Sequence, residues 1–310
     1  MLLARLLLAS SFAAFAWNAV AGEPEVVRLW PGTPPGPAPF VAEGVEESGS
    51  TDGRSHGGKT VLRITDVTAP EMHIYRAPEQ TATGAACVVC PGGGFSILAW
   101  DMGGTEVAER LNGLGVTAAV LKYRCPTRPK AKKNPTGMWR GPAIDAQRAL
   151  SILRSRADEL AVDPEMIGIG GSSAGGKTAA VAAIRAGERL YEPVDGADSA
   201  SCRADFAWLL YPAYLTDETG TLKPEVRPTF GVDPPPVFFA HAADDPVTCG
   251  GSVSLFLALR SARAEPELHI YASGGHAFGL RPTPTRSERW GAEWESWLVA
   301  GGWGTAAAAD

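Results

Sequence analysis

The segment from Ile167 to Val181, IGIGGSSAGGKTAAV, contains two motifs that belong to different kinds of chemistry. Residues Gly171–Thr178 fit G-x-x-x-x-G-K-[ST], a loop whose backbone amides and lysine bind the phosphates of a nucleotide. The same letters contain G-x-S-x-G, a sharp turn that exposes a nucleophilic serine, here Ser173. Both motifs lie between a strand and a helix, so residues elsewhere in the chain must decide between them.

Two further segments end in side chains that could work with a nucleophilic serine. HAADD follows the apolar run VFFA and supplies Asp244 and Asp245, and SGGHAFG follows LHIYA and supplies His276. The chain order serine, acid, histidine is that of hydrolases in which these residues follow successive parallel strands. We expect Asp244 to orient His276, with Asp245 as the alternative.

Glycine-rich turns lie where backbone amides could bind the negative charge that develops when a carbonyl is attacked. Glycines on either side of Ser173 remove side chains that would collide around the turn. Ala174 begins the following helix, so its N–H can point at the oxyanion. The loop CPGGGF follows an earlier apolar run, and its Gly93 and Gly94 are expected to supply the remaining amides.

The phosphate-binding motif explains fewer of these features. A nucleotide hydrolase needs a carboxylate for Mg²⁺ at the end of a neighbouring strand, and Asp244 could take that role. The glycine loop at 90–95 and His276 would then have no purpose. The other histidines show no metal-ligand spacing. We therefore favour the serine nucleophile, expect no metal and no organic cofactor, and keep a nucleotide hydrolase as a remote alternative.

The rest of the chain predicts how these residues are positioned. Six short, nearly continuous apolar runs, typical of strands covered by helices on both faces, lie at 85–90, 116–123, 166–171, 206–211, 237–242 and 268–272. Helical patterns alternate with them. This alternation predicts an α/β protein with a doubly wound, mostly parallel sheet and right-handed crossovers. The alternating stretches 61–65 and 72–77 are expected to form antiparallel leading strands.

The first residues predict where the protein works. Residues 1–21 are mostly apolar, carry Arg5 as their one charged residue and end in Ala-Val-Ala, which is typical of a secretory signal peptide. We expect a secreted or periplasmic protein without stable membrane insertion after the signal is removed. We expect residues 22–83 to form an N-terminal arm and leading strands, 84–300 the catalytic core, and 301–310 a flexible tail.

Charge and cysteine content exclude some functions. The formal net charge is −6, and no block of Lys and Arg indicates a nucleic-acid surface. The cysteines lie at positions 87, 90, 125, 202 and 249, and their odd number leaves at least one thiol unpaired. Residues 87 and 90 point to opposite faces of one expected strand, so structural cysteines are favoured over a redox pair. Whether Cys202 and Cys249 pair stays open.

Two other regions allow alternative interpretations. The Pro-rich segment 215–236 lies between two expected strands and is either a plain connection or part of a wall over the site. The tryptophans at 290, 294 and 297 share one helical face, which favours packing against the sheet over a platform for stacking sugars.

Five segments together resemble bacterial exported α/β hydrolases of the acetylxylan esterase and related carbohydrate esterase type: CPGGGF, LGVTAAVLKYR, GPAIDAQRALSILRSRADELAVDPEMIGIGGSSAGG, HAADDPV and ELHIYASGGHAFGL. The resemblance covers residues 84–300 and implies the α/β-hydrolase fold. It implies a catalytic role for Ser173, Asp244 and His276, with oxyanion donors at Gly93, Gly94 and Ala174.

The resemblance also implies a function. We expect a serine esterase that hydrolyses carboxylic esters, in particular acetyl groups on xylan or related plant polysaccharides. Alternatives are a feruloyl or small-molecule carboxylesterase of the same fold and a non-catalytic carbohydrate-binding relative. The chain departs from these relatives at Lys177, where His or Asn is common, and in LAWDMGGTE, which lacks the usual His-Glu-Gly. Acyl or sugar preference can differ there.

Overall fold

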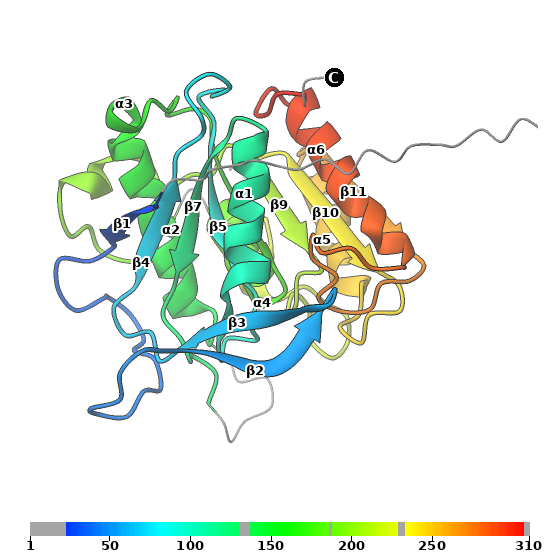
Figure 1. Ribbon diagram of the computed structural model, residues 1–310, viewed down its shortest axis with the longest axis horizontal. Coiled ribbons are helices and arrows are strands. Elements are labelled where there is room, and N and C mark those ends of the chain that lie inside the picture. Colours follow the sequence, from blue (N-terminus) through cyan, green and yellow to red (C-terminus); the bar gives the residue numbers. More distant parts are fainter. Residues whose placement is uncertain (1–22, 130–136, 186–187, 229–232, 307–310) are drawn as a thin grey trace, which may run out of the picture.

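The computed structural model describes residues 23–129, 137–185, 188–228 and 233–306; the expected signal segment lies outside them. A central sheet of eight strands has the order β1-β4-β7-β5-β8-β9-β10-β11 (Figure 1). Its strands are β1 (Glu25–Arg28), β4 (Glu71–Tyr75), β5 (Ala86–Cys90), β7 (Thr117–Lys122), β8 (Ile167–Ser172), β9 (Ala207–Leu210), β10 (Val237–Ala242) and β11 (Pro266–Tyr271).

Strand directions confirm the predicted fold class. Strand β5 pairs in parallel with both β7 and β8, and parallel pairing continues through β9 and β10 to β11. Strands β1 and β4 are antiparallel leading strands. Every residue of β5, β7, β8, β9 and β10 is buried, and the continuous apolar runs in the sequence follow from this burial on both faces.

One expected leading strand belongs to a different sheet. The stretch 61–65 lies in β3 (Lys59–Thr65), which pairs with β2 (Ser48–His56) and β6 (Leu98–Ala99) in a separate three-stranded sheet. Its place beside β4 is taken by β1, from the segment expected to be an irregular arm. Alternation of apolar and polar residues indicates that one face of a strand is exposed to solvent, but it does not indicate which strand it pairs with.

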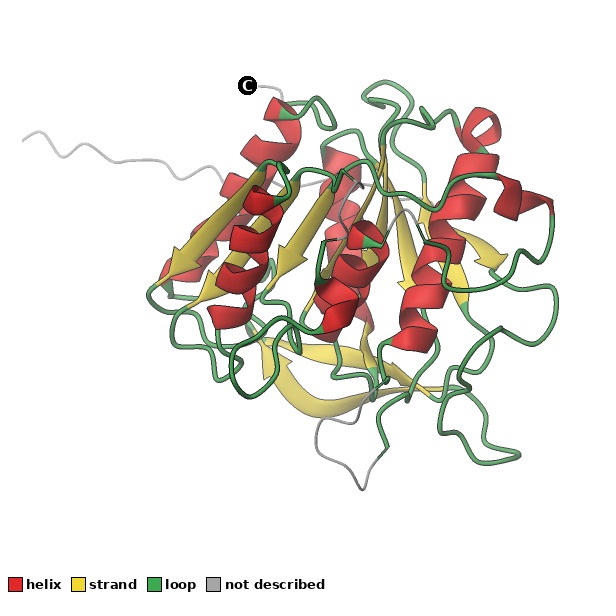
Figure 2. Cartoon of the chain, turned by 180° about the vertical axis from the view of Figure 1, so that it is seen from behind, coloured by secondary structure: helices red, strands yellow, loops and turns green. Residues whose placement is uncertain are grey.

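Helices cover both faces of the main sheet. Helices α1 (Glu106–Gly113) and α6 (Trp290–Ala300) lie on one face, and α2 (Arg140–Ser155), α4 (Ala174–Ile184) and α5 (Gly250–Ser261) lie on the other (Figures 1 and 2). Short helical turns complete the chain: η1 (Asp101–Thr105), α3 (Ala157–Leu160), η2 (Gly196–Ser199), η3 (Pro224–Val226) and η4 (Arg286–Arg289).

The tryptophans of α6 pack against the sheet, as predicted. Trp290 and Trp294 are buried, and the ring of Trp294 lies 5.2 Å from that of Trp208 in β9.

The prediction of a flexible C-terminal tail is wrong for residues 301–306. Trp303 stacks on Phe206 at 4.5 Å, and the Thr305 amide donates to the Leu114 carbonyl. Apolar packing therefore holds this part of the C-terminus in place.

A buried ion pair attaches the N-terminal arm to the core. Arg124, which follows β7, donates to Asp145 of α2, and both side chains are fully buried. The same guanidinium donates to the carbonyls of Pro35 and Pro37, and Trp30 donates its indole N–H to Asp145. Hydrogen bonds to both side chains offset the cost of burying the two charges. The network therefore fixes the N-terminal arm against α2 and the segment that follows β7.

The cysteines are free thiols, which agrees with a structural role. Cys87 and Cys90 are buried within β5, and Cys87 accepts a hydrogen bond from the indole of Trp208 at 3.4 Å. Burial raises the pKa of Cys87 to about 12, so its thiol stays protonated. Within the described residues, no helix has the length and apolar character needed to span a bilayer.

Parallel pairing brings the ends of distant segments together. The carboxyl ends of β5, β8, β9, β10 and β11 lie along one edge of the main sheet, because these strands all run in the same direction. The small sheet of β2 and β3 lies beneath this edge in Figure 1.

Candidate active site

Ser173 occupies a strained turn between β8 and α4. Its backbone has φ 54° and ψ −118°, a conformation that a residue with a side chain rarely adopts. A Cβ atom at Gly171 would lie 2.6 Å from the Cys90 carbonyl oxygen, and one at Gly175 would lie 2.0 Å from it. Both glycines are therefore required because the turn passes directly over the end of β5.

The turn presents the serine hydroxyl to a histidine 103 residues further along the chain. Ser173 Oγ lies 2.8 Å from Nε2 of His276, and Nδ1 of His276 lies 2.8 Å from Oδ2 of Asp245. An acidic partner at Nδ1 keeps the proton on that nitrogen, so Nε2 is free to accept the serine proton. The loops after β8, β10 and β11 thus assemble a continuous Ser–His–Asp hydrogen-bond chain.

The acidic member of this chain is Asp245, and the expectation of Asp244 is wrong. Asp244 is exposed and accepts a hydrogen bond from the Gly275 amide at 2.8 Å. Asp245 is buried, with Oδ1 accepting from the Val247 amide at 2.6 Å and Oδ2 facing His276. The turn after β10 directs adjacent side chains in opposite directions, so only the second aspartate points into the protein.

A second histidine contacts the same carboxylate. His241, fully buried in β10, places Nε2 2.9 Å from the Val247 carbonyl and 3.2 Å from Asp245 Oδ2. Because both of these groups are acceptors, Nε2 carries the proton, and Nδ1 accepts from the Ser252 hydroxyl at 2.9 Å. His241 was not among the predicted site residues. The available signal was its position four residues before Asp245, at the end of the same strand.

These contacts hold Asp245 in its ionised form. Burial alone would raise the pKa of this carboxyl, but hydrogen bonds from His241, His276 and the Val247 amide lower it to about 2. A carboxylate that is charged at all ordinary pH values can stabilise positive charge on His276 whenever a proton arrives there.

A cavity of about 540 Å³ lies over the serine. Gly93 and Gly94 line it together with Ser173 and His276, so the structure brings the predicted glycine loop to the same place as the hydroxyl. Within the described residues, the amides of Gly93 and Gly94 donate to no other backbone group. Ala174 is the first residue of α4 and is fully buried beside Ser173.

Residues from the small sheet and from the loop after β9 complete this cavity. His56 of β2 and Val61 of β3 line it, although they lie more than 100 residues before Ser173 in the chain. Tyr211 has a left-handed backbone with φ 37°, and its buried ring contacts the His276 imidazole edge to face at 5.0 Å. No local sequence pattern could assign these residues, because only the pairing of distant strands places them here.

The phosphate-loop motif has a structural explanation. Lys177 is 1% exposed, donates to Glu225 at 2.7 Å and also donates to the Tyr214 carbonyl. The Thr178 hydroxyl donates back to the Ala174 carbonyl within α4. Burial lowers the pKa of Lys177 to about 8, against the opposing effect of Glu225. The two residues that would bind phosphate and Mg²⁺ are thus engaged inside the protein.

The segment after β9 is a wall as well as a connection. Residues 215–218 and 223–225 line a second cavity next to the first, and the Lys177–Glu225 ion pair attaches this segment to α4. In the part of the chain that the structure describes, no group of three or more His, Cys, Asp or Glu side chains is placed to hold a metal ion.

Comparisons with known proteins agree with this architecture. A family model for the alpha/beta hydrolase fold matches residues 87–280. The chain is 28% identical over 246 residues to an acetylxylan esterase of Xylanibacter ruminicola, covering 72% of this chain and 46% of that protein. It is 26% identical over 242 residues to an esterase of Mycobacterium tuberculosis, covering 68% and 55%. The chain thus spans about half the length of these relatives.

Solved structures show the same fold. An acetyl ester-xyloside bifunctional hydrolase from Caldicellulosiruptor lactoaceticus is 23% identical with a TM-score of 0.67, covering 92% of this chain and 98% of that chain. The propionate-bound esterase Est2 of Thermogutta terrifontis is 24% identical with a TM-score of 0.63, covering 78% and 93%. On the match over residues 87–280, this chain belongs to the α/β-hydrolase fold family.

Proposed function

We propose that the protein is a serine esterase that removes acetyl groups from xylan or related plant polysaccharides. The observation that carries this proposal is the hydrogen-bond chain from Ser173 through His276 to Asp245. The names of the relatives support an ester substrate, because two of them are an acetylxylan esterase and an esterase. The acetyl and xylose parts of the proposal are further supported by the acetyl ester-xyloside hydrolase of similar fold.

In the proposed reaction, Ser173 Oγ attacks the ester carbonyl carbon while its proton moves to His276 Nε2. Asp245 stabilises the resulting imidazolium through Nδ1. The carbonyl oxygen becomes an oxyanion, which accepts hydrogen bonds from backbone amides at Gly93, Gly94 and Ala174. When the carbonyl re-forms, the C–O bond to the alcohol breaks and His276 returns the proton to the leaving oxygen.

Water then completes the cycle. It attacks the acyl-serine, again losing a proton to His276, and the second tetrahedral intermediate expels Ser173 Oγ with that proton. The products are a carboxylic acid and an alcohol. Apart from this water and the ester, the groups that act in both half-reactions are protein side chains and backbone amides.

Export is the second part of the proposal. The apolar residues 1–21 and their Ala-Val-Ala ending support cleavage before Gly22 and release outside the cytoplasm. Mass spectrometry of protein recovered from the medium or periplasm of an expressing bacterium is expected to give a chain starting at Gly22. Recovery of the uncleaved chain in the cytoplasm alone would contradict export without affecting the proposed chemistry.

The activity is tested by comparing esters that differ in one half of the molecule. We expect release of acetate from acetylated xylan and from p-nitrophenyl acetate, and a loss of at least about 10³-fold in kcat for Ser173→Ala. Methyl ferulate serves as the competing substrate. A much higher kcat/KM for the ferulate ester would replace the acetyl proposal with a feruloyl esterase, and full activity in Ser173→Ala would end the proposal.

A further inference from the structure

A second cavity adjoins the one over Ser173. Its volume is about 720 Å³, against about 540 Å³ for the cavity that contains the serine and histidine. Tyr214 and Val247 line both cavities, so the two spaces share a wall. The serine cavity alone is far larger than an acetyl group needs, and the adjoining cavity has room for another part of a ligand.

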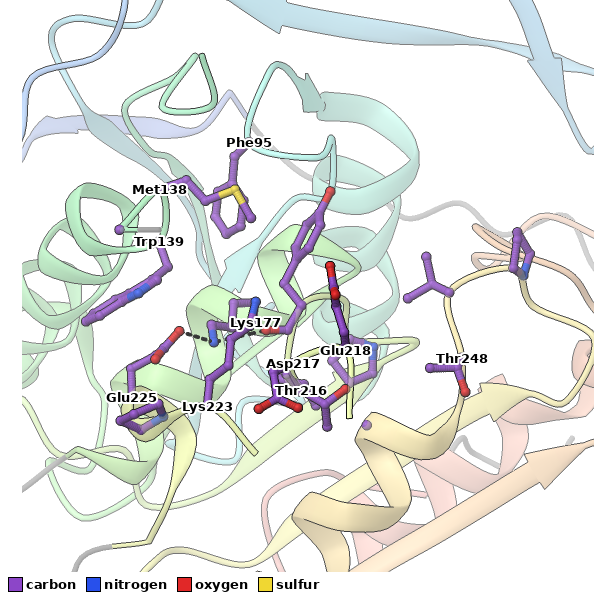
Figure 3. Close-up of a pocket in the computed structure, with 18 residues that line it drawn as sticks. Phe95, Met138, Trp139, Lys177, Thr216, Asp217, Glu218, Lys223, Glu225 and Thr248 are labelled. Carbon is purple, nitrogen blue, oxygen red and sulfur yellow. Dashed lines mark hydrogen bonds and ion pairs between the residues drawn. The ribbon is translucent and has the colours of Figure 1, made fainter. Parts of the chain in front are cut away.

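The second cavity is built by an anchored segment. The connection from β9 to β10 supplies one side, through residues 215–218 and 223–225. The ion pair between buried Lys177 and partly exposed Glu225 holds its far end to α4, as Figure 3 shows. Near its start, Asp217 accepts hydrogen bonds from the amides of Thr219 and Thr221, which fixes the turn. The wall therefore has a defined shape before any ligand arrives.

The lining combines aromatic rings with hydrogen-bonding groups. Trp139 and Tyr214 are partly exposed and contribute flat apolar surfaces, and the fully buried ring of Phe95 packs beside that of Tyr214. The same cavity is also lined by polar residues, which are labelled in Figure 3: Thr216, Asp217, Glu218, Lys223 and Thr248. Sugars present apolar C–H faces that pack on aromatic rings and hydroxyl groups that bind carboxylates, hydroxyls and ammonium groups, so both kinds of surface are used by one ligand.

Charge argues against an anionic ligand. The lysine at the base of the cavity, Lys177, is neutralised by Glu225. Among the described lining residues, the remaining charges are then one positive charge on Lys223 and two negative charges on Asp217 and Glu218. A phosphate or a carboxylate would meet net negative charge here, whereas a neutral polyol would not.

We propose that this second cavity is a glycan subsite, which binds neutral sugar units of the alcohol part of the ester next to the acetylated unit held at Ser173. The inference rests on the proposed function for the identity of the reacting group. It goes beyond that function by assigning the 215–225 wall to substrate selection. The subsite makes the enzyme prefer acetyl groups on oligosaccharides over those on small alcohols.

The test fills the cavity and compares two acetyl esters. Thr248 is exposed on the cavity rim, so Thr248→Trp blocks the space without touching the Ser–His–Asp chain. Leu257→Trp is the matched control, because Leu257 is an exposed residue of α5 outside the lining. The substrates are acetylated xylotriose and p-nitrophenyl acetate, which share the acyl group and differ in the alcohol.

We expect Thr248→Trp to lower kcat/KM for acetylated xylotriose by about tenfold or more, and to change p-nitrophenyl acetate hydrolysis by less than about twofold. Leu257→Trp is expected to leave both values unchanged. Glu218→Ala, at another exposed position in the lining, is expected to act in the same direction if Thr248→Trp folds poorly. Equal effects on both esters, or a larger effect on p-nitrophenyl acetate than on acetylated xylotriose, would overturn the inference.

Binding separates this inference from the proposed function. Calorimetric titration of unacetylated xylotriose into Ser173→Ala protein needs no catalysis, and we expect binding that Thr248→Trp abolishes. Binding that survives Thr248→Trp, or no binding at all, would refute the subsite even if the esterase is active. Conversely, an inactive wild-type enzyme that still binds xylotriose in this cavity would refute only the esterase.

Discussion

Replacing each of the two adjacent aspartates with asparagine tests the geometry of the site most finely. In Asp245, Oδ1 accepts from the Val247 amide, and Oδ2 faces Nδ1 of His276 and Nε2 of His241. All three neighbours are N–H donors, and a carboxylate accepts from all of them. An asparagine side chain has one oxygen, so its NH₂ group must oppose a donor whichever way it is turned.

The consequence follows from the Val247 contact. The Val247 amide, at 2.6 Å, can only donate, whereas an imidazole can change tautomer, so we expect the asparagine oxygen on the Val247 side and the NH₂ group toward His276 and His241. His276 must then accept at Nδ1 and carry its proton on Nε2, where it can no longer receive the proton of Ser173. A change of this kind lowers kcat by about 10⁴-fold in serine hydrolases, which corresponds to about 5.5 kcal/mol of transition-state stabilisation.

Asp244→Asn provides the matched control. Asp244 is exposed and makes one hydrogen bond, from the Gly275 amide, which an asparagine oxygen can also accept. We expect its kcat on p-nitrophenyl acetate to stay within about threefold of wild type. Thermal unfolding followed by circular dichroism checks that both variants are folded. If the two folded variants have similar kcat values, whether both stay active or both lose activity, the assignment of Asp245 is refuted.

Three further predictions concern the groups around this chain. His241→Phe removes a donor from Asp245, and we expect kcat to fall by about tenfold with KM unchanged in steady-state assays; an unchanged kcat would contradict it. Lys177→Met leaves Glu225 without its partner, so we expect urea denaturation to show a free energy of unfolding lower by about 3 kcal/mol. The double variant Lys177→Met/Glu225→Met is expected to recover most of this loss. Equal losses in the single and double variants would contradict the prediction. The pKa of Asp245 is about 2 in the folded protein, against an ordinary value of 3.8. This lowered pKa adds about 2 kcal/mol to the free energy of unfolding. The contribution is present above about pH 4 and is lost as the pH falls to about 2. The decline in unfolding free energy over that range should therefore be smaller by this amount in Asp245→Asn, and identical declines would contradict it.

The sequence predicts the parts of the structure that have a local physical cause. Burial on both faces gives continuous apolar runs, so the parallel strands and their order along the chain could be read directly. The serine turn was predictable because only glycine fits at 171 and 175, where a side chain would enter the end of β5. His276 could be paired with Ser173 because both follow apolar strands of the predicted parallel sheet.

The remaining features depend on geometry that no local pattern encodes. Asp244 and Asp245 have the same chemistry, and only the direction of the turn after β10 decides which one is buried. The stretch 61–65 alternates as a leading strand would, yet its partners are β2 and β6 rather than β4. His241 reads as part of a buried run, and its role follows from the position of Asp245 four residues later.

The most direct test of the central claim is to label the nucleophile. A fluorophosphonate reacts with a serine hydroxyl only when a neighbouring base activates it, and the adduct can be mapped by mass spectrometry of peptides. We expect a single adduct on Ser173 in the wild-type protein, with labelling slowed by orders of magnitude in His276→Ala. An adduct on another residue, or equal labelling rates in the two proteins, would contradict the proposal that His276 activates Ser173.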